Sequence, residues 1–342
     1  MNKTKEVSII IPVYNIEKYL RQCLDSVANQ SFQNTEIIII NDCSTDGSYH
    51  IIEEYKKKYP DIIVVNLEKN VGLGNARNEG LKIATGAYVV FIDSDDWVTP
   101  DYIEILYSNI KKYNCDLIIA NHCTFDDKTK SFKLFNNPDI FYDYIIDSAV
   151  NKQKVLTLRM IWSAWNKIYS RSFLTDNNIF FKTNKMEDIL FIYEIILSSN
   201  KFMFIKNHLY YYRINRTDSI MSNKKDRIYS CIEAVSKIKQ LLASKNLYDT
   251  YKQSFYSYAL TLFAAEFEVS DLNLKTLKDI AERIKQEFFE DMKIKLPKTY
   301  DKFFYRLRIN LFYFCLKYNL NYGFFGKTAR KFYDFVFNKK II

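Results

Sequence analysis

Glycine and proline are scarce in this chain of 342 residues, with 7 and 5 copies respectively. Five of the seven glycines lie between residues 47 and 86. Because glycine permits positive φ and close backbone approach to a ligand, we expect the ligand-binding loops within the first hundred residues. Neither residue type occurs from position 221 to position 296, which predicts helices in the last third of the chain.

Other patterns are missing as well. The six cysteines are scattered without a CxxC pair, which excludes the usual zinc site and a disulfide framework and favours reduced thiols. No uninterrupted apolar run reaches the roughly 18 residues that a membrane span needs. The apolar stretch 7–13 is short and contains Pro12, so we do not expect a secretory signal. These absences predict a cytoplasmic protein that is soluble or peripheral on the inner face of the cell membrane.

The formal charge of +9 is unevenly distributed. Residues 221–342 contain 23 Lys and Arg against 13 Asp and Glu, whereas the first 220 residues contain 26 and 27. The last 42 residues combine nine basic side chains with fourteen aromatic ones. This composition suits an amphipathic element on an anionic membrane surface, and it also suits single-stranded nucleic acid or a packed aromatic core. We favour the membrane and expect no nucleic-acid partner.

The first 120 residues alternate between strand-like and helix-like patterns. The expected strands are 7–13, 36–40, 62–65, 88–92 and 117–120, and the expected helices are 16–27, 51–59, 75–84 and 103–110. Repeated units of this length predict an α/β fold, with a mostly parallel sheet covered by helices on both faces. Residues 125–220 follow no clear pattern. Helical periodicity returns from about 226, with one apolar stripe over 228–242 and another over 277–288.

Polar side chains follow three of the expected strands. Asn15 follows the first, Asn41 and Asp42 end the second, and the run 93–96 (Asp-Ser-Asp-Asp) follows the fourth. Ligands of such sheets bind at the carboxyl ends of the strands. Three clustered carboxylates would repel one another, and a hard cation such as Mg²⁺ or Mn²⁺ would relieve that repulsion. Helix capping near Pro100 is the competing explanation, and we favour the metal.

Two further segments are ambiguous from the residues alone. Residues 70–78 form a glycine-containing loop that enters a helix, and such a loop can present backbone N–H groups and Arg77 to a phosphate. A glycine turn with a solvated arginine would read the same. Glu187 and Asp188 precede an apolar helical run, where carboxylates also serve as first-turn acids.

Taken together, these segments resemble the family 2 glycosyltransferases, which have the GT-A (Rossmann-like) fold. The matching stretches are 7–15 (VSIIIPVYN), 41–48 (NDCSTDGS), 70–78 (NVGLGNARN) and 91–96 (FIDSDD), in the family's order and spacing. Weaker matches continue through 165–169 (WNKIY), 187–188 (ED) and 211–213 (YYR). Cys43 departs from the family, which often has glycine there.

The resemblance implies a role for each matching residue. Pro12, Tyr14, Asn15 and Asp42 would line the pocket for the donor base, which is usually uracil, and Arg77, Asp93 and Ser94 would contact the rest of the donor. Asp93 and Asp95 would form the DxD motif that holds Mn²⁺ or Mg²⁺. Asp188 would be the catalytic base, and Arg213 and Arg216 would contact the pyrophosphate.

The resemblance also implies an activity. The chain would be an inverting hexosyltransferase that moves a hexose or N-acetylhexosamine from a nucleotide diphosphate sugar, expected to be a UDP-sugar, to a glycan or lipid-linked acceptor in bacterial surface polysaccharide synthesis. A non-catalytic nucleotide-sugar-binding protein and a nucleotidyltransferase are the two alternatives. We expect a catalytic domain over 1–222, with a nucleotide-binding half at 1–115 and an acceptor-side half at 116–222. A helical, basic, aromatic-rich region would follow at 223–342.

Overall fold

The computed structural model describes residues 5–142, 144–157, 162–182, 186–216 and 224–269, together with 280, 283, 284, 287 and 288. The chain divides into two compact units. Unit 1 comprises Met1–Val155 and Arg159–Thr217, and unit 2 comprises Leu156–Leu158 and Asp218–Ile342. Unit 1 contains the expected nucleotide-binding half 1–115 and most of the expected acceptor-side half 116–222, and the domain boundary at 222 stays a prediction. The basic segment 301–342 lies outside the described residues.

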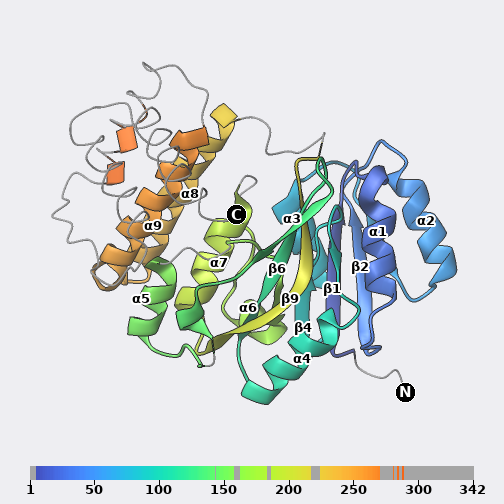
Figure 1. Cartoon of the computed structure of the whole chain (residues 1–342), viewed down its shortest axis with the longest axis horizontal. Coiled ribbons are helices and arrows are strands. Elements are labelled where there is room, and N and C mark those ends of the chain that lie inside the picture. Colours follow the sequence, from blue (N-terminus) through green and yellow to red (C-terminus); the bar gives the residue numbers. More distant parts are fainter. Residues whose placement is uncertain are drawn as a thin grey trace, which may run out of the picture. The chain divides into compact units, whose positions relative to one another are not determined.

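Unit 1 alternates strands with helices (Figure 1). Its elements, with α5 reaching into unit 2, are β1 (Val7–Val13), α1 (Glu17–Ala28), β2 (Thr35–Asn41), α2 (Ser48–Lys58), β3 (Ile63–Asn66), α3 (Leu73–Ile83), β4 (Tyr88–Phe91), β5 (Trp97–Val98), α4 (Tyr102–Tyr113), β6 (Leu117–Asp126), β7 (Ser131–Phe135), η1 (Asp139–Phe141), α5 (Ala149–Thr157), β8 (Lys167–Ser170), α6 (Arg171–Asp176), α7 (Glu187–Ser198) and β9 (Phe202–Ile214). The four expected helices and five expected strands of the first 120 residues are all present, with shifted ends.

The strands form one sheet in the order β3-β2-β1-β4-β8-β6-β9-β5, and β7 pairs with β6 at one side. β3, β2, β1 and β4 are mutually parallel, whereas β8 runs antiparallel to both β4 and β6. β1 lies in the middle of the parallel part, and all seven of its residues are buried. A strand buried on both faces reads as a continuous apolar run, which is why the segment 7–13 was recognisable in the sequence.

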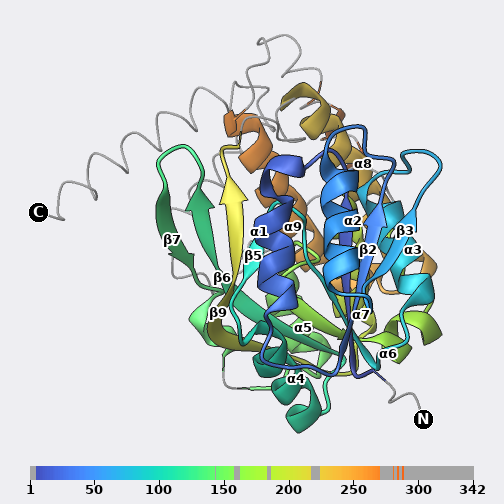
Figure 2. The ribbon, with the colours of Figure 1, turned by 90° about the vertical axis from the view of Figure 1, so that its right-hand side faces the viewer.

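Helices cover both faces of the parallel strands. Ile9 and Ile11 of β1 share a core cluster with side chains of α1, α2 and α4, and α1 and α2 lie in front of the sheet in Figure 2. Ile10 points to the other face, where α3 packs so closely that a Cβ atom on Gly80 would lie 2.4 Å from the Ile10 side chain. The predicted two-sided α/β architecture is therefore confirmed.

The carboxyl ends of the parallel strands share one edge. The last residue of β1, Val13, pairs with Asn41 at the end of β2, and Asn41 pairs with Asn66 at the end of β3. Ile10 of β1 pairs with Phe91 at the end of β4. The polar segments that follow β1, β2 and β4 are consequently brought to the same edge.

Unit 2 contains a helical hairpin of α8 (Lys224–Ser244) and α9 (Tyr248–Val269). The stripe expected on the first helix is buried, comprising Ile228, Cys231, Ile232, Val235, Ile238 and Leu242. Of the second stripe, Ile280, Ile284 and Phe288 are helical and buried, and Leu277 lies outside the described residues. The expected helical character of this region is confirmed where the structure describes it. No helix in the described part of the chain is both long and apolar enough to cross a membrane.

Candidate functional site

The acidic run after β4 forms a compact cluster of oxygen ligands. One carboxylate oxygen from each of Asp93, Asp95 and Asp96 lies within 4.8 Å of the others. A turn in which the Asp96 N–H donates to the Asp93 carbonyl oxygen at 3.1 Å brings them together. Oxygen donors in this arrangement fit Mg²⁺ or Mn²⁺, which are usually held by one or two carboxylates together with substrate phosphates.

The three aspartates are not equivalent. Asp96 is buried, and it accepts from the Tyr210 hydroxyl at 2.8 Å and from the Arg213 backbone N–H at 2.7 Å. Asp95 pairs with Arg216, its Oδ2 atom lying 2.8 Å from Nε. Burial raises the pKa of Asp95 and Asp96, and the negative charge of Asp93 adds to both shifts. Asp96 is thus held by hydrogen bonds and Asp95 by an ion pair, and a cation bound to the cluster would offset the repulsion among the three carboxylates.

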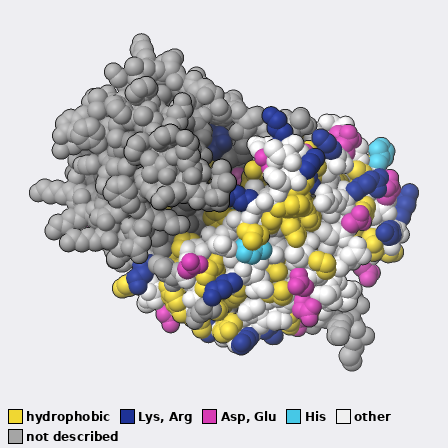
Figure 3. Space-filling model, viewed as in Figure 1, with side chains coloured by type: hydrophobic (Ala, Val, Ile, Leu, Met, Phe, Trp, Pro, Cys, Tyr) yellow, Lys and Arg dark blue, Asp and Glu magenta, His cyan; other side chains and the backbone are white. Residues whose placement is uncertain are grey.

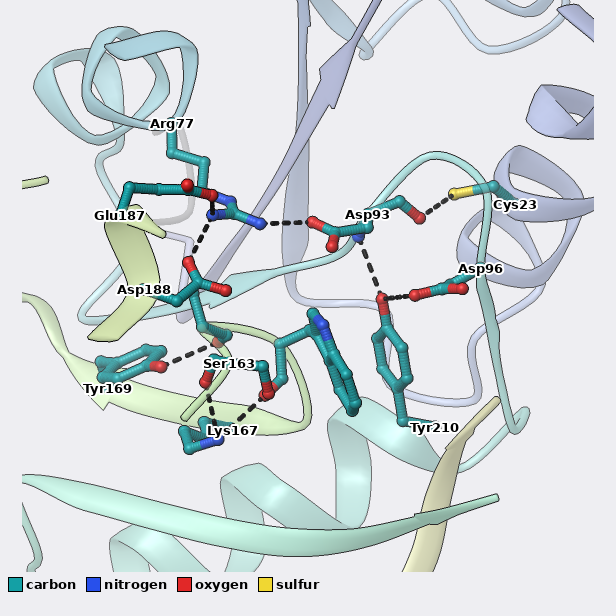
Figure 4. Close-up of polar contacts among 12 residues, drawn as sticks. Cys23, Arg77, Asp93, Asp96, Ser163, Lys167, Tyr169, Glu187, Asp188 and Tyr210 are labelled. Carbon is teal, nitrogen blue, oxygen red and sulfur yellow. Dashed lines mark hydrogen bonds and ion pairs between the residues drawn. The ribbon is translucent and has the colours of Figure 1, made fainter. Parts of the chain in front are cut away.

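Arg77 connects the Asp93–Asp96 acidic cluster to the first turn of α7 (Figure 4). Its guanidinium is fully buried and lies 2.6 Å from Asp93 Oδ1, 2.6 Å from Asp188 Oδ1 and 3.0 Å from Glu187 Oε1. α3 supplies Arg77, the turn after β4 supplies Asp93, and α7 supplies the other two acids. The structure therefore brings together residues that lie 16 to 111 positions apart in the chain.

One guanidinium faces three carboxylates in this cluster, and the pKa values reflect the imbalance. Burial, followed by the charge of Asp188, raises the pKa of Glu187 to about 7, against the opposing effect of Arg77. Burial also raises the pKa of Asp188, while Arg77, the N–H of Ala164 and Lys167 act to lower it. A buried carboxylate with a raised pKa and a fixed cationic partner is a typical candidate for proton transfer.

The acids at the start of α7 do not cap that helix. Its N-cap residue is Met186, whose side chain forms no capping hydrogen bond. Glu187 and Asp188 lie in the first turn, and both side chains reach Arg77. The long-range ion pairs thus distinguish this pair from ordinary first-turn acids.

Asp42 and Asn15 organise the loops after β2 and β1. Both Asp42 oxygens accept from the backbone N–H groups of Val71 and Gly72, at 2.7 and 2.9 Å. Gly72 has a φ of 86°, a conformation that costs little for glycine alone. Asn15 accepts from the Thr45 N–H at 2.7 Å. The expected base-pocket residues therefore lie at one edge of the sheet, as the register of β1 and β2 requires.

The remaining expected site residues differ in exposure. Pro12 is buried within β1, while Tyr14 directly after it is 45% exposed. Ser94 is buried between the two aspartates of the DxD sequence. All three residues therefore lie at or next to the carboxyl ends of β1 and β4. Their contacts to a donor stay predictions.

Arg213 is held by the protein at each of its guanidinium nitrogens. Nε donates to the Asp95 carbonyl oxygen at 2.8 Å, one terminal nitrogen to Asp127 at 2.9 Å, and the other to Gln22 at 2.6 Å. The guanidinium also lies over the ring of Trp97, 4.9 Å from its centre. Of the two arginines expected at the pyrophosphate, Arg216 pairs with the Asp95 carboxylate, whereas the Arg213 side chain binds the Asp95 backbone.

Sequence reasoning missed several residues that shape the site. Tyr210 bridges the cluster by donating to Asp96 and accepting from the Asp93 N–H at 3.1 Å. Lys167 is fully buried beside the loop that approaches Asp188. The segment 165–169 is a weak motif in the sequence, and only the tertiary structure shows which residues it contacts.

Comparisons with known proteins agree with this geometry. The family model described as "Glycosyl transferase family 2" matches residues 8–177. The chain is 32% identical over 262 residues to the putative glycosyltransferase EpsH of Bacillus subtilis, covering 75% of this chain and 74% of EpsH. It is 33% identical over 246 residues to the glycosyltransferase GlyA of Streptococcus pneumoniae, covering 70% of this chain and 35% of GlyA.

Solved structures match as well. TarS 1–349 of Staphylococcus aureus in complex with UDP-GlcNAc aligns with a TM-score of 0.54 and 23% identity, over 91% of this chain and 81% of that one. The mannosyltransferase PcManGT of Pyrobaculum calidifontis, in complex with GDP-Man and Mn²⁺, aligns with a TM-score of 0.50 and 14% identity, over 92% and 85%. At these identities the likeness concerns the fold, and it supports the GT-A architecture.

Proposed function

The chain belongs to glycosyl transferase family 2, and from this premise we propose that it is a metal-dependent, inverting hexosyltransferase that uses a nucleotide diphosphate sugar. The observation that carries the proposal is the Arg77 cluster, in which one guanidinium binds Asp93 of the acidic cluster and Asp188 of α7 together. Arg77 thus binds both the carboxylate that we propose as the base, Asp188, and one that we propose as a metal ligand, Asp93.

The donor is proposed to be a UDP-sugar that carries a hexose or N-acetylhexosamine. TarS of Staphylococcus aureus, named a poly(ribitol-phosphate) beta-N-acetylglucosaminyltransferase, is 31% identical to this chain over 223 residues and has a solved complex with UDP-GlcNAc. Asp42 retains accepting capacity beyond its two backbone bonds, because each carboxylate oxygen has two lone pairs. It could therefore accept from a uracil N–H beside Pro12, Tyr14 and Asn15.

The transfer follows from the charges in the site. Asp93 and Asp95 would hold Mn²⁺ or Mg²⁺, which supplies a Lewis acid for the negative charge that grows on the departing nucleoside diphosphate. Arg216, paired with Asp95, would add positive charge on the pyrophosphate side. Asp188 would accept the proton of the acceptor hydroxyl as that oxygen attacks the anomeric carbon. Attack opposite the leaving group inverts the anomeric centre and needs no covalent intermediate.

The acceptor is proposed to be a glycan or a lipid-linked glycan of a bacterial surface polymer, modified on the cytoplasmic side of the membrane. Relatives point in this direction by name, as with TarS and with the poly(ribitol-phosphate) beta-glucosyltransferase of Bacillus spizizenii, which is 33% identical over 224 residues. Because the match spans 35% of GlyA and 37% of TarS, the acceptor is proposed from similarity in the shared region alone.

Metal dependence gives the decisive test. Purified full-length chain should release UDP from one member of a panel of UDP-sugars, lose this activity after chelation, and recover it with Mn²⁺ or Mg²⁺. Asp95→Asn should lose turnover and should weaken Mn²⁺ binding measured by calorimetry. Asp61→Asn is the matched control, because Asp61 is an exposed aspartate that precedes β3 at the opposite edge of the sheet.

Two results would contradict the proposal. Full activity after exhaustive chelation would remove the metal assignment. Tight binding of a UDP-sugar with Mn²⁺, but no turnover with or without bacterial extracts that contain glycan and lipid-linked acceptors, would favour a non-catalytic binding protein instead.

A further inference from the structure

The loop 163–166, directly before β8, is held by a buried amine. The Lys167 side chain is fully buried, and its Nζ donates to the Ser163 carbonyl oxygen and to Asn166 Oδ1, both at 2.7 Å, and to the Trp165 carbonyl oxygen at 3.3 Å. A buried ammonium is costly unless its donors are satisfied. These three acceptors belong to one short loop, so the amine acts as a clamp on that loop.

The backbone of loop 163–166 has an unusual conformation and is bound on a second side. Asn166 has a φ of 57°, in the left-handed region that residues other than glycine and asparagine rarely adopt. The loop is also fixed to β6, because Asn166 Nδ2 donates to the Ala120 carbonyl oxygen at 2.6 Å and the Ala120 N–H donates to the Asn166 carbonyl oxygen at 3.0 Å. Its conformation is thus set by the Lys167 amine together with β6, an interior strand of the sheet.

On one side, the loop meets the proposed base. The backbone N–H of Ala164 donates to the Asp188 carboxylate. The carbonyl oxygen of the same residue accepts from the Tyr169 hydroxyl at 2.8 Å. Lys167, Tyr169 and Asp188 lie together in Figure 4. A loop that shifted would therefore withdraw a hydrogen bond from Asp188 and leave Arg77 as its main partner.

On the other side, the loop reaches the Asp93–Asp96 acidic cluster through Tyr210. The Trp165 ring stacks on Tyr210, with ring centres 4.6 Å apart and an interplanar angle of 13°, and on Tyr212 at 4.8 Å. Tyr210 in turn donates to Asp96 and accepts from the Asp93 N–H. The loop thus contacts Asp188 through Ala164 and reaches the Asp93–Asp96 turn through Trp165 and Tyr210.

We propose that Lys167 is a positioning residue, which holds loop 163–166 so that Asp188 and the Asp93–Asp96 turn keep one fixed geometry. This assignment rests on the proposed roles of Asp188 as the base and of Asp93 and Asp95 as the metal ligands. The proposal assigns a role in catalysis to the segment 165–167 (Trp-Asn-Lys), and this role cannot be read from the sequence alone.

Lys167→Met tests the proposal, because methionine keeps most of the volume and removes all three donors. Misplacement of a catalytic group by about 1 Å costs roughly a hundredfold in rate. We therefore expect kcat for UDP release from UDP-GlcNAc with Mn²⁺ to fall about 10- to 100-fold, while the KM for the donor changes less than about twofold. Tyr169→Phe removes only the hydroxyl that holds Ala164, and its kcat should fall about 3- to 10-fold in a protein of unchanged fold.

The matched control is Lys56→Met. Lys56 also binds loop carbonyl oxygens, those of Pro60 at 2.7 Å and of Ile62, but at the amino-terminal edge of the sheet. This variant should keep the wild-type kcat even if its melting temperature falls. A loss of kcat as large as that of Lys167→Met would show that the effect is general destabilisation, and the proposal would fail.

A double-mutant cycle separates this inference from the assignment of the base. If Lys167 acts through Asp188, adding Lys167→Met to Asp188→Asn should reduce kcat less than twofold further, whereas independent effects would multiply. Multiplying losses would overturn the action of Lys167 through Asp188, and wild-type kcat in both Lys167→Met and Tyr169→Phe would overturn the positioning role altogether. Wild-type turnover in Asp188→Asn alone would instead overturn the proposed base, whatever the lysine variants do.

Discussion

At the scale of single residues, Asp188 is poised between opposing influences. Burial and the charge of Asp93 raise its pKa, whereas Arg77, the Ala164 N–H and Lys167 lower it. The net shift is upward, so the carboxylate is a stronger base than an exposed aspartate while remaining bound to a cation. Glu187 and Tyr169 are the other titratable groups that share this environment.

Asp188→Asn should reduce kcat about a hundredfold or more and leave donor affinity nearly unchanged, because only proton removal is lost. Calorimetry with UDP and Mn²⁺ measures the affinity, and UDP release measures the turnover. Wild-type kcat should rise with pH through the raised pKa of Asp188, since the protonated carboxyl cannot accept. Collapse of UDP binding in the variant would indicate a structural role and would direct attention to Glu187.

Glu187 offers a prediction about stability. Its pKa is raised from 4.5 to about 7, so its ionisation is harder in the folded chain than in the unfolded one. This carboxyl therefore lowers the free energy of unfolding as the pH rises from about 4.5 through about 7. In metal-free protein at pH 8, Glu187→Gln should be more stable than wild type by roughly 1–3 kcal/mol.

Chemical denaturation at pH 4 and pH 8 measures this difference. At pH 4 wild-type Glu187 is protonated in both states, so the two proteins should unfold alike, which provides the internal control. A variant that is less stable than wild type at pH 8 would mean that the bond from Arg77 to an ionised Glu187 outweighs the cost of burying its charge.

At the scale of elements, α3 carries Arg77 and must approach β1 closely to deliver it. Gly80 lies one turn after Arg77 on α3, where a Cβ atom would clash with Ile10. Gly80→Ala should therefore push the helix away from the sheet and cost roughly 1–3 kcal/mol of stability, despite the better helix propensity of alanine.

The displacement should also reach the site. Because Arg77 moves with α3, UDP release by Gly80→Ala should fall even at temperatures where the variant is folded. Lys82→Ala on the exposed side of the same helix is the control, and its melting temperature and kcat should stay near wild type. Equal melting temperatures for Gly80→Ala and wild type would show that Ile10 can move aside at little cost.

At the scale of the whole molecule, the net charge differs between the first 220 residues, which are nearly neutral, and the last 42, which are basic. Lys and Arg side chains are interspersed with Asp and Glu over the face of unit 1 in Figure 3, in keeping with 26 basic and 27 acidic residues among the first 220. The last 42 residues hold nine basic and two acidic side chains. An attraction to an anionic surface would therefore come from this terminal segment.

Membrane attachment through that segment is testable. Each basic side chain near an anionic leaflet contributes about 1 kcal/mol, so engagement of half of them would hold the chain at the surface. The full chain should co-sediment with vesicles of phosphatidylserine and phosphatidylcholine at low salt and less at high salt. A version that ends at Pro297 should not co-sediment, and it should still release UDP.

Two outcomes would contradict this prediction. Equal vesicle binding by both versions would place the membrane contact elsewhere in the chain. Failure of the shortened version to fold would mean that the terminal aromatic side chains belong to a packed core.

The sequence by itself determined the α/β order of the first 120 residues and the family. Strands such as 7–13 are buried on both faces and are therefore mostly apolar, and the residues that follow them are polar because they lie at the ligand edge of the sheet. These signals are local. The region 125–220 showed no clear pattern in the sequence because its strands mix buried and exposed positions, as in β9, where exposed Lys206 and Asn207 interrupt a run of buried residues.

Only the tertiary structure decided which residues meet. Arg77, Asp93 and Asp188 come from three elements, and no spacing in the sequence predicts that one guanidinium joins them. Lys167 and Tyr210 likewise reach the site through packing, one through the loop before β8 and the other through β9. The physical reason is that periodicity reports which face of an element is buried, whereas the partners of a buried polar group depend on how distant elements cross.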